Sequence, residues 1–407
     1  MKYRLKKHSG RLKGQVKLES SKSESNRALI VNALSGNNGS LTHLAKARDT
    51  ETMQALLASS SQELDVKDAG TTMRFLTAYL AVRGSGQIIT GTDRMKKRPI
   101  GPLVDSLRKI GANIEYVGEE GFPPMKITRL TQQLSDRISI PGNISSQYIS
   151  ALMMIAPCLP KGLEIELTTE VYSRPYIELT QNIMQQFGVE SKFEDDRISI
   201  SAQQYIGTDH SIEGDWSGAS YWYSFLALAD TSSLLELASV RPSSPQGDRV
   251  ISEIMTHFGI KSHFESGKVL LQKSNSQQKT IDLDFKNCPD LAQTIMAAAA
   301  VSGVTLHMTG LESLKIKETD RILAMRTELS KLGATLDEMD SKWVLSPSEQ
   351  LPASIEVDTY EDHRMAMAFA PLSQLMEVII DDPAVVNKSY PGFWEEVKKL
   401  GVEVEEI

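Results

Sequence analysis

The sequence Leu329-Ser-Lys-Leu-Gly333-Ala-Thr-Leu336 contains the pattern that decides the fold. An amphipathic helix ends at a glycine, and an alternating strand follows it. Glycine suits this position because the residue after a helix often adopts the left-handed region, where glycine meets no steric penalty. Alternation of apolar and polar residues is typical of a strand with one buried face. The segment therefore predicts a helix, a tight turn and a strand.

The same pattern occurs four more times along the chain. It stands at Leu107-Arg-Lys-Ile-Gly111, Ile183-Met-Gln-Gln-Phe-Gly188, Ile254-Met-Thr-His-Phe-Gly259 and Val397-Lys-Lys-Leu-Gly401. Successive glycines are 77, 71, 74 and 68 residues apart, so the 407 residues divide into about six units of about 70 residues. A helix also fits residues 50–57, but only 52 residues separate residue 59 from Gly111. We therefore expect a first unit that has lost a strand or two.

The length and the repeat together predict an α/β (α+β) protein with two domains. A single core usually stops growing at roughly 250–300 residues, and this chain has 407. Three units in each domain is the simplest division. The repeat is too long for a Rossmann βα unit of about 30 residues, and the chain has neither GxGxxG nor GxxxxGKS/T. Dinucleotide-binding and P-loop functions therefore lack their motifs.

The composition is that of a soluble globular protein with an acidic balance. There are 44 Lys and Arg residues against 52 Asp and Glu residues, and a net charge of −8 argues against nucleic-acid and polybasic membrane partners. Cys158 and Cys288 form no CxxC pair and no cluster with zinc spacing, so we expect neither a disulfide scaffold nor a metal site. No apolar segment follows the basic N-terminus, so no secretory signal is expected. The uncharged runs 138–160 and 291–311 contain proline or glycine, which favours buried helices with turns or strands over membrane spans.

Basic and hydroxyl residues stand before helices in the first half of the chain. Helix N-termini bind anions through free N–H groups and the positive end of the dipole. Each motif alone is an ordinary capping signal, but together they predict several anion-binding helix starts. They are Ser21-Lys22-Ser23-Glu24-Ser25-Asn26-Arg27 before a helix at 28–34, Asp68-Ala-Gly70-Thr71-Thr-Met-Arg74 before 74–82, Arg94-Met-Lys-Lys-Arg98 before Pro99, Ser145-Ser146-Gln147 before 148–156, and Ser173-Arg-Pro-Tyr176 before 177–187.

The second half supplies carboxylates and further cations. Asp290 opens a helix at 291–301, and Lys388 precedes a final helix around Trp394. Two more motifs are Lys317-Glu318-Thr-Asp-Arg321, before a helix at 322–332, and Asp362-His-Arg364, before a helix at 365–370. Lys317 and Arg321 are four residues apart, a spacing that can place both on one helical face. A buried cation without an acidic partner is costly, so an anionic ligand is one way to satisfy such groups.

These motifs resemble those of the 5-enolpyruvylshikimate-3-phosphate synthase family, and the likeness runs from about residue 10 to the C-terminus. Gln246-Gly247-Asp248 and Pro289-Asp290 match as well. The resemblance implies an inside-out α/β barrel in each of two domains, with three βαβαββ units per domain and a cleft between the domains. Domain one would be residues 1–20 plus 218–407 and would supply phosphoenolpyruvate-side groups. Domain two, residues 21–217, would supply shikimate 3-phosphate-side groups.

The resemblance also implies the reaction and its residues. The enolpyruvyl group of phosphoenolpyruvate would move to the 5-hydroxyl of shikimate 3-phosphate by addition and elimination, without metal or cofactor, in a cytoplasmic monomer whose domains close. The catalytic residues would be Asp290, Glu318 and Lys22, with the proton transfers at carbon divided between the last two. Shikimate 3-phosphate would meet Ser23, Arg27, Ser145, Ser146, Gln147, Ser173, Tyr176, Asp290 and Lys317. Phosphoenolpyruvate would meet Lys22, Gly70, Thr71, Arg98, Gln147, Arg321, Arg364 and Lys388.

Some positions depart from the family pattern, and two alternatives remain. Glu19-Ser20 stands where members usually have Pro-Gly, and Asp68 and Ser313 each stand where Asn is usual. A carboxylate at position 68 would repel a phosphate, so Asp68→Asn is expected to lower the KM for phosphoenolpyruvate. One alternative is the sister enzyme UDP-N-acetylglucosamine enolpyruvyl transferase, although no Cys lies in the loop 94–101. The other is an inactive paralogue that only binds sugar phosphates.

Overall fold

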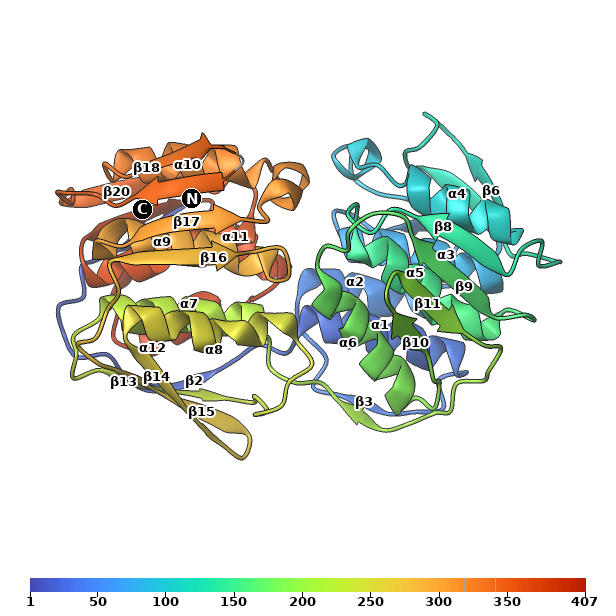
Figure 1. Ribbon diagram of the computed structural model, residues 1–407, viewed down its shortest axis with the longest axis horizontal. Coiled ribbons are helices and arrows are strands. Elements are labelled where there is room, and N and C mark those ends of the chain that lie inside the picture. Colours follow the sequence, from blue (N-terminus) through green and yellow to red (C-terminus); the bar gives the residue numbers. More distant parts are fainter. Residues whose placement is uncertain (318, 341) are drawn as a thin grey trace. The chain divides into compact units, whose positions relative to one another are not determined.

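The computed structural model describes residues 1–317, 319–340 and 342–407, and the chain forms two compact units (Figure 1). The terminal unit comprises Met1–Ser20 and Glu213–Ile407, and the central unit comprises Ser21–Ile212. The second crossing thus lies five residues before the expected boundary at 217/218. The reason is a local pairing within the terminal unit. Ser20 forms a β-bridge with Gly214, and the N–H of Asp215 donates to the oxygen of Glu19 at 2.8 Å.

The described part of the terminal unit contains three four-stranded sheets of one topology. In the first, β16 (Thr280–Asp284) runs parallel to β17 (Thr305–Thr309). Two antiparallel strands complete it, β19 (Lys342–Ser346) and then β18 (Thr335–Met339) at the edge. With α9 (Ala292–Ser302) and α10 (Arg321–Lys331) between the strands, the chain order is βαβαββ.

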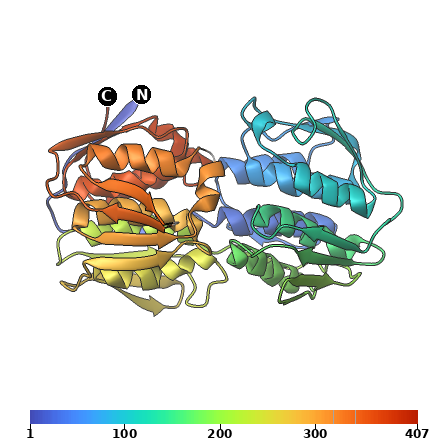
Figure 2. The same cartoon turned by 45° about the horizontal axis from the view of Figure 1, so that its top comes forward.

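The other two sheets repeat this order with strands borrowed from the N-terminal segment. One consists of β14 (Ile260–Glu265), β15 (Lys268–Lys273), β13 (Leu234–Ala238) and β2 (Lys13–Lys17). The other consists of β20 (Ser354–Val357), β21 (Glu377–Asp381), β1 (Lys2–Leu5) and β22 (Val404–Glu406). The two chain ends lie side by side in this sheet, where the N–H of Lys2 donates to the oxygen of Ile407 at 3.2 Å (Figure 2).

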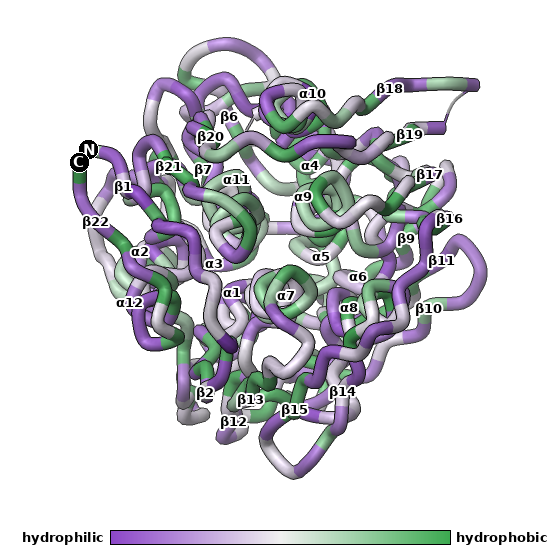
Figure 3. Tube along the Cα trace, turned by 90° about the vertical axis from the view of Figure 1, so that its left-hand side faces the viewer, coloured by the Kyte–Doolittle hydropathy of each residue, from purple (hydrophilic) through white to green (hydrophobic). Residues whose placement is uncertain are grey.

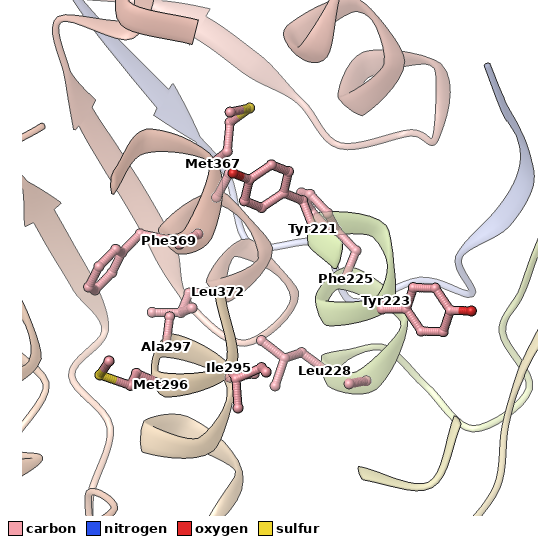
Figure 4. Close-up of a cluster of buried hydrophobic side chains, with 14 of the residues drawn as sticks. Tyr221, Tyr223, Phe225, Leu228, Ile295, Met296, Ala297, Met367, Phe369 and Leu372 are labelled. Atoms are coloured by element: carbon pink, nitrogen blue, oxygen red, sulfur yellow. The ribbon is translucent and has the colours of Figure 1, made fainter. Parts of the chain in front are cut away.

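Three apolar helices fill the middle of the terminal unit: α7 (Trp216–Leu228), α9 and α11 (His363–Phe369). A helix that is apolar on all sides must be buried, and every residue of α11 is. Figure 3 shows the three helices surrounded by strands, and Figure 4 shows buried side chains of this core, among them Phe225 of α7, Ile295 of α9 and Met367 of α11. The helices α8 (Ile251–Ile254) and α12 (Phe393–Lys399) bury one face each, as α10 does.

The central unit contains two sheets of the same topology and one shortened sheet. The first complete sheet has the strand order β4 (Glu63–Asp65), β5 (Ser85–Thr90), β7 (Met125–Thr128) and β6 (Asn113–Tyr116). The second has the order β10 (Lys192–Glu194), β11 (Arg197–Ile200), β9 (Leu163–Leu167) and β8 (Arg137–Ile140). In the third, β12 (His210–Ser211) pairs in parallel with β3 (Leu41–Thr42), and no antiparallel strand is added among the residues that the structure describes. The prediction of a first unit short of a strand or two is confirmed.

Six helices belong to the central unit: α1 (Lys22–Leu34), α2 (Arg48–Leu57), α3 (Gly70–Arg83), α4 (Gly101–Ile110), α5 (Ser146–Ile155) and α6 (Arg174–Gln186). The expected starts at 28 and 74 are wrong, because α1 and α3 begin six and four residues earlier. Ser21 caps α1 by accepting the N–H of Glu24 at 3.3 Å. The polar motif residues therefore form the first helical turn instead of preceding it.

The five helix-ending glycines have the predicted backbone. Their φ values are 119° at Gly111, 80° at Gly188, 81° at Gly259, 83° at Gly333 and 89° at Gly401. The two-domain α/β architecture is also confirmed, with helices inside and sheets outside each unit. The sheets stay separate, however, and the described strands form no closed barrel. Of the helices that the structure describes, none is long and apolar enough to cross a membrane.

Candidate active site

The first turn of α1 presents the amino group of Lys22 beside a buried carboxylate. Lys22 Nζ lies 3.2 Å from Oδ2 of Asp49, whose side chain is 3% exposed against 17% for Lys22. Asp49 stands in the first turn of α2, and its backbone oxygen accepts the hydroxyl of Thr72 on α3 at 3.0 Å. Three helix starts are thus held together at one place in the central unit.

The guanidinium of Arg27 is buried among neutral groups. Its Nε donates to Thr180 Oγ1 at 2.7 Å, and Nη2 donates to Ser150 Oγ at 3.1 Å. Nη1 donates to the backbone oxygen of Ser23 at 2.9 Å. Burial lowers the pKa of Arg27 to about 10. Because a desolvated cation with neutral partners retains unbalanced charge, this group suits an anionic ligand.

The start of α3 is crowded by two further guanidinium groups. A Cβ placed on Gly70 would lie 2.7 Å from Nη1 of both Arg74 and Arg98. Arg74 Nη1 also donates to the backbone oxygen of Gly70 at 2.9 Å. Next to it, Gln147 Nε2 donates to Thr71 Oγ1 at 3.2 Å, which joins the starts of α5 and α3. Free N–H groups at a helix start flanked by guanidinium groups suit a phosphate.

A carboxylate stands beside this cationic group. Asp68 Oδ2 lies 3.5 Å from Nη2 of Arg48, and their side chains are 32% and 53% exposed. The expectation that Asp68 repels a phosphate rests on its negative charge, and the ion pair offsets part of that charge.

The remaining central-unit candidates stand at helix starts, as the motifs predict. Ser145 caps α5 and accepts the N–H of Gln147 at 3.3 Å, with Ser146 as the first helical residue. Ser173 precedes α6 with a φ of 58°, a left-handed backbone unusual for a residue with a side chain. Tyr176, on the first turn of α6, lies with its ring centroid 5.9 Å from the guanidinium carbon of Arg27.

In the terminal unit, one carboxylate joins two arginines. Asp290 Oδ1 lies 3.1 Å from Nη1 of Arg321, and Oδ2 lies 2.8 Å from Nη2 of Arg364. Arg321 is 2% exposed, and its Nε donates to Asp362 Oδ2 at 2.7 Å. Asp362 also caps α11 by accepting the N–H of Arg364 at 2.9 Å. We call Asp290, Arg321, Asp362 and Arg364 the Asp290 cluster.

A second carboxyl group lies near this cluster. Asp248 is buried and accepts the hydroxyl of Ser217. Burial, with the charge of Asp290, raises the pKa of Asp248 to about 7. Burial also raises the pKa of Tyr221, whose hydroxyl accepts from Nη1 of Arg364 at 3.3 Å, to about 12.

The other terminal-unit candidates are less closely grouped. Lys388 is buried at the end of the short 3₁₀ helix Pro383–Lys388. Lys317 is half-buried and precedes α10, so it does not share a helical face with Arg321. Glu318 lies outside the described residues. Among those described, no group of three His, Cys, Asp or Glu side chains is arranged to hold a metal ion.

Sequence reasoning assigned no role to several residues that orient these groups. Asp49, Ser150 and Thr180 are 27, 123 and 153 residues from the cations that they contact, and no local pattern indicates those contacts. Asp362 carried a signal, because an Asp directly before an apolar helix is a capping residue. Its second contact, to Arg321, depends on tertiary packing and has no sequence signal.

Comparisons with known proteins agree on one family. The model of EPSP synthase (3-phosphoshikimate 1-carboxyvinyltransferase) matches residues 6–61 and 54–397. A 3-phosphoshikimate 1-carboxyvinyltransferase of Bacteroides fragilis (strain YCH46) is 45% identical over 395 residues, which cover 96% of each chain. Another from Sulfurovum sp. (strain NBC37-1) is 34% identical and covers 96% of this chain and 97% of its own. The EPSP synthase structure from Acinetobacter baumannii has a TM-score of 0.80 and covers 100% of both chains at 21% identity, which supports the fold alone.

Proposed function

The chain belongs to the EPSP synthase family, and on that basis we propose that it transfers the enolpyruvyl group of phosphoenolpyruvate to the 5-hydroxyl of shikimate 3-phosphate, with release of phosphate. The observation that carries this function is the 45% identity to a relative of that name over 96% of both chains. The reaction is a step of the shikimate pathway and aromatic amino-acid biosynthesis.

The reaction divides into an addition and an elimination. In the addition, the 5-hydroxyl oxygen bonds to C2 of phosphoenolpyruvate, loses its proton to Asp290, and C3 gains a proton to become a methyl group. In the elimination, the C2–O bond to phosphate breaks and a proton leaves C3, which restores the double bond. We assign the proton transfers at C3 to Glu318 and Lys22. General acid–base groups of this kind typically contribute 10²- to 10⁴-fold in rate.

The Asp290 cluster supports a link between substrate binding and the base. A planar carboxylate forms bidentate hydrogen bonds with a guanidinium, so the phosphoenolpyruvate carboxylate suits Arg321 and Arg364. In the structure both arginines contact Asp290. When the substrate carboxylate takes these donors, Asp290 loses charge-assisted bonds and becomes the stronger base. Binding of phosphoenolpyruvate would thus activate the group that receives the hydroxyl proton.

Anion-suited groups in the central unit supply the remaining substrate contacts. Shikimate 3-phosphate is bound by Ser23, Arg27, Ser145, Ser146, Gln147, Ser173 and Tyr176 of the central unit and by Asp290 and Lys317 of the terminal unit. Phosphoenolpyruvate is bound by Lys22, Gly70, Thr71, Arg98 and Gln147 of the central unit and by Arg321, Arg364 and Lys388 of the terminal unit. Groups on both units are needed for one reaction, so we infer that the units close on the substrates and exclude water. We also propose a cytoplasmic monomer, which sedimentation velocity would test.

One assay tests this function and its rival. Purified protein is mixed with phosphoenolpyruvate, and phosphate release is followed with shikimate 3-phosphate, with UDP-N-acetylglucosamine, or with neither. Release only with shikimate 3-phosphate is expected. Release only with the nucleotide sugar would favour the sister enzyme, and no release would favour a non-catalytic binder. Asp290→Asn should lower kcat about 10²- to 10⁴-fold, whereas Asp282→Asn, at an exposed carboxylate on β16, should not.

A further inference from the structure

Glu24, in the first turn of α1, forms a buried pair with His210 of β12 that the proposed reaction does not use. Nε2 of His210 lies 2.9 Å from Oε1 of Glu24, and their side chains are 5% and 3% exposed. A carboxylate accepts the N–H of an imidazole at this distance. The His210 ring also packs 6.1 Å from the ring of Phe187. Both polar groups are therefore satisfied inside the central unit, away from solvent.

Each member of the pair stands close to a crossing of the chain between the two units. Glu24 is the fourth residue of the central unit, and His210 is the third from its end. The strand of His210 is held by backbone bonds, in which its N–H donates to Ser40 at 2.9 Å and that of Ile212 donates to Thr42 at 3.1 Å. The Glu24–His210 contact thus attaches the start of α1 to a fixed strand at the other end of the unit.

The same turn carries Lys22 and Ser23, the residues nearest the proposed chemistry. Both are half-buried, and Lys22 Nζ lies 3.2 Å from Asp49. A helix can slide along or rotate about its axis unless side chains on several sides hold it. Ser25 Oγ accepts the N–H of Ala45 at 3.0 Å, and Arg27 contacts α5 and α6. Glu24 provides the only one of these contacts that reaches β12.

We propose that Glu24 and His210 are a positioning pair that sets the place of Lys22 and Ser23 in the reaction. This inference rests on the proposed function. Replacing both partners of a buried hydrogen bond by apolar groups of similar shape can be nearly neutral for stability. A pair that only stabilised the fold would then leave the kinetic constants of the apolar variant unchanged. A positioning pair would raise the KM for shikimate 3-phosphate through Ser23 and lower kcat through Lys22.

Three variants separate the two roles. Glu24→Leu combined with His210→Phe removes the directional bond and fills the space beside Phe187. Glu24→Gln keeps an oxygen that accepts the imidazole N–H, so it serves as the conservative rescue. The matched control is His43→Asn, because His43 Nδ1 lies 3.1 Å from Ser211 Oγ on the same strand but is exposed. His43 has a φ of 56°, which Asn tolerates.

The measurements are kcat and KM well below the melting temperature, together with amide hydrogen exchange of residues 21–34. We expect the double variant to lose about 10- to 100-fold in kcat/KM for shikimate 3-phosphate, and its α1 amides to exchange faster. Glu24→Gln and His43→Asn should stay within about threefold. A double variant with unchanged kcat and KM would overturn the proposal. Unchanged amide hydrogen exchange of α1 would also overturn it, and that measurement does not require an active enzyme. If the unmodified protein itself releases no phosphate, the proposed function fails, and hydrogen exchange still decides whether the pair holds α1.

Discussion

Gly70 is a position where the lack of a side chain serves the site, because a Cβ would lie 2.7 Å from two guanidinium groups. Gly70→Ala should displace Arg98 and weaken the hold on the phosphate of phosphoenolpyruvate. The loss of a charge-assisted hydrogen bond predicts a KM for this substrate raised about 10-fold or more, with the fold intact. Gly101→Ala is the matched control, since Gly101 also begins a helix and its Cβ would meet only Gly121 Cα at 3.6 Å. Equal KM values for both variants would contradict this role.

The Arg48–Asp68 pair predicts coupled effects of two substitutions on the KM for phosphoenolpyruvate. Asp68→Asn should lower the KM for phosphoenolpyruvate, and Arg48→Gln should raise it about two- to fivefold by leaving the Asp68 carboxylate less compensated. The double variant should resemble Asp68→Asn, because the charge that Arg48 offsets is then gone. Both effects should shrink at about 0.5 M salt, where exposed charges are screened. Additive effects of the two substitutions would show that the residues act separately.

Asp248 predicts a pH-dependent stability in the terminal unit. Its pKa is raised from 3.8 to about 7, chiefly by burial. The folded state therefore binds this proton more tightly than the unfolded chain does. As a result, Asp248 hardly lowers the free energy of unfolding below pH 4 and lowers it increasingly as the pH rises to 7. Asp248→Asn keeps an acceptor for Ser217 and should raise stability by about 1–3 kcal/mol at pH 8. Thermal unfolding from pH 8 to pH 4.5 should show the gain shrinking; a constant gain would contradict the assignment.

At the scale of elements, helix ends followed from the sequence, whereas the starts of α1 and α3 did not. A residue with φ near +80° strongly favours glycine, so the five helix-ending glycines were visible in the sequence. Helix α1 begins six residues before the expected start, because a polar first turn resembles a loop until its cap is seen. Contacts such as Lys22 to Asp49 and Arg27 to Thr180 join separate helices and cannot be inferred from local spacing. The resemblance supplied the candidate site residues, but not the contacts that orient them.

Gly259 gives a stability prediction at this scale. It ends a helical segment with a φ of 81°, and a Cβ there would lie 2.4 Å from the backbone oxygen of Ser276. Gly259→Ala should therefore cost more than the 1–2 kcal/mol of left-handed strain alone. Gly392→Ala is the control, since its φ is −82° and nothing lies within 4 Å of its Cβ. Chemical denaturation of both variants gives their free energies of unfolding. Similar losses of stability in the two variants would contradict the prediction.

For the whole molecule, the repeat predicted six repeats of about 70 residues, two domains and one shortened repeat, because a single repeat cannot bury its apolar helix faces alone. The two hydrophobic cores are separate sets of residues, one in each unit. The fragment 21–212 should therefore fold alone, with helical circular dichroism and a cooperative thermal transition. The fragment 21–200 lacks β12 and the contact of His210 with Glu24, so it should melt at a lower temperature. A non-cooperative transition of the longer fragment would show that the central unit depends on the terminal one.

The place of β1 has a consequence for synthesis on the ribosome. Residues 2–5 pair with 378–381, and residues 3–5 pair with 404–406, so the sheet that they join cannot form until nearly four hundred residues have been added. The central unit needs only the chain up to Ile212, so it can fold before the strands that pair with β1 and β2 have been synthesised. Pairing between such distant segments is slow and leaves strand edges exposed in the meantime. During that interval the terminal strands, more than the central unit already formed, are the part of the nascent chain that would need the protection of a chaperone.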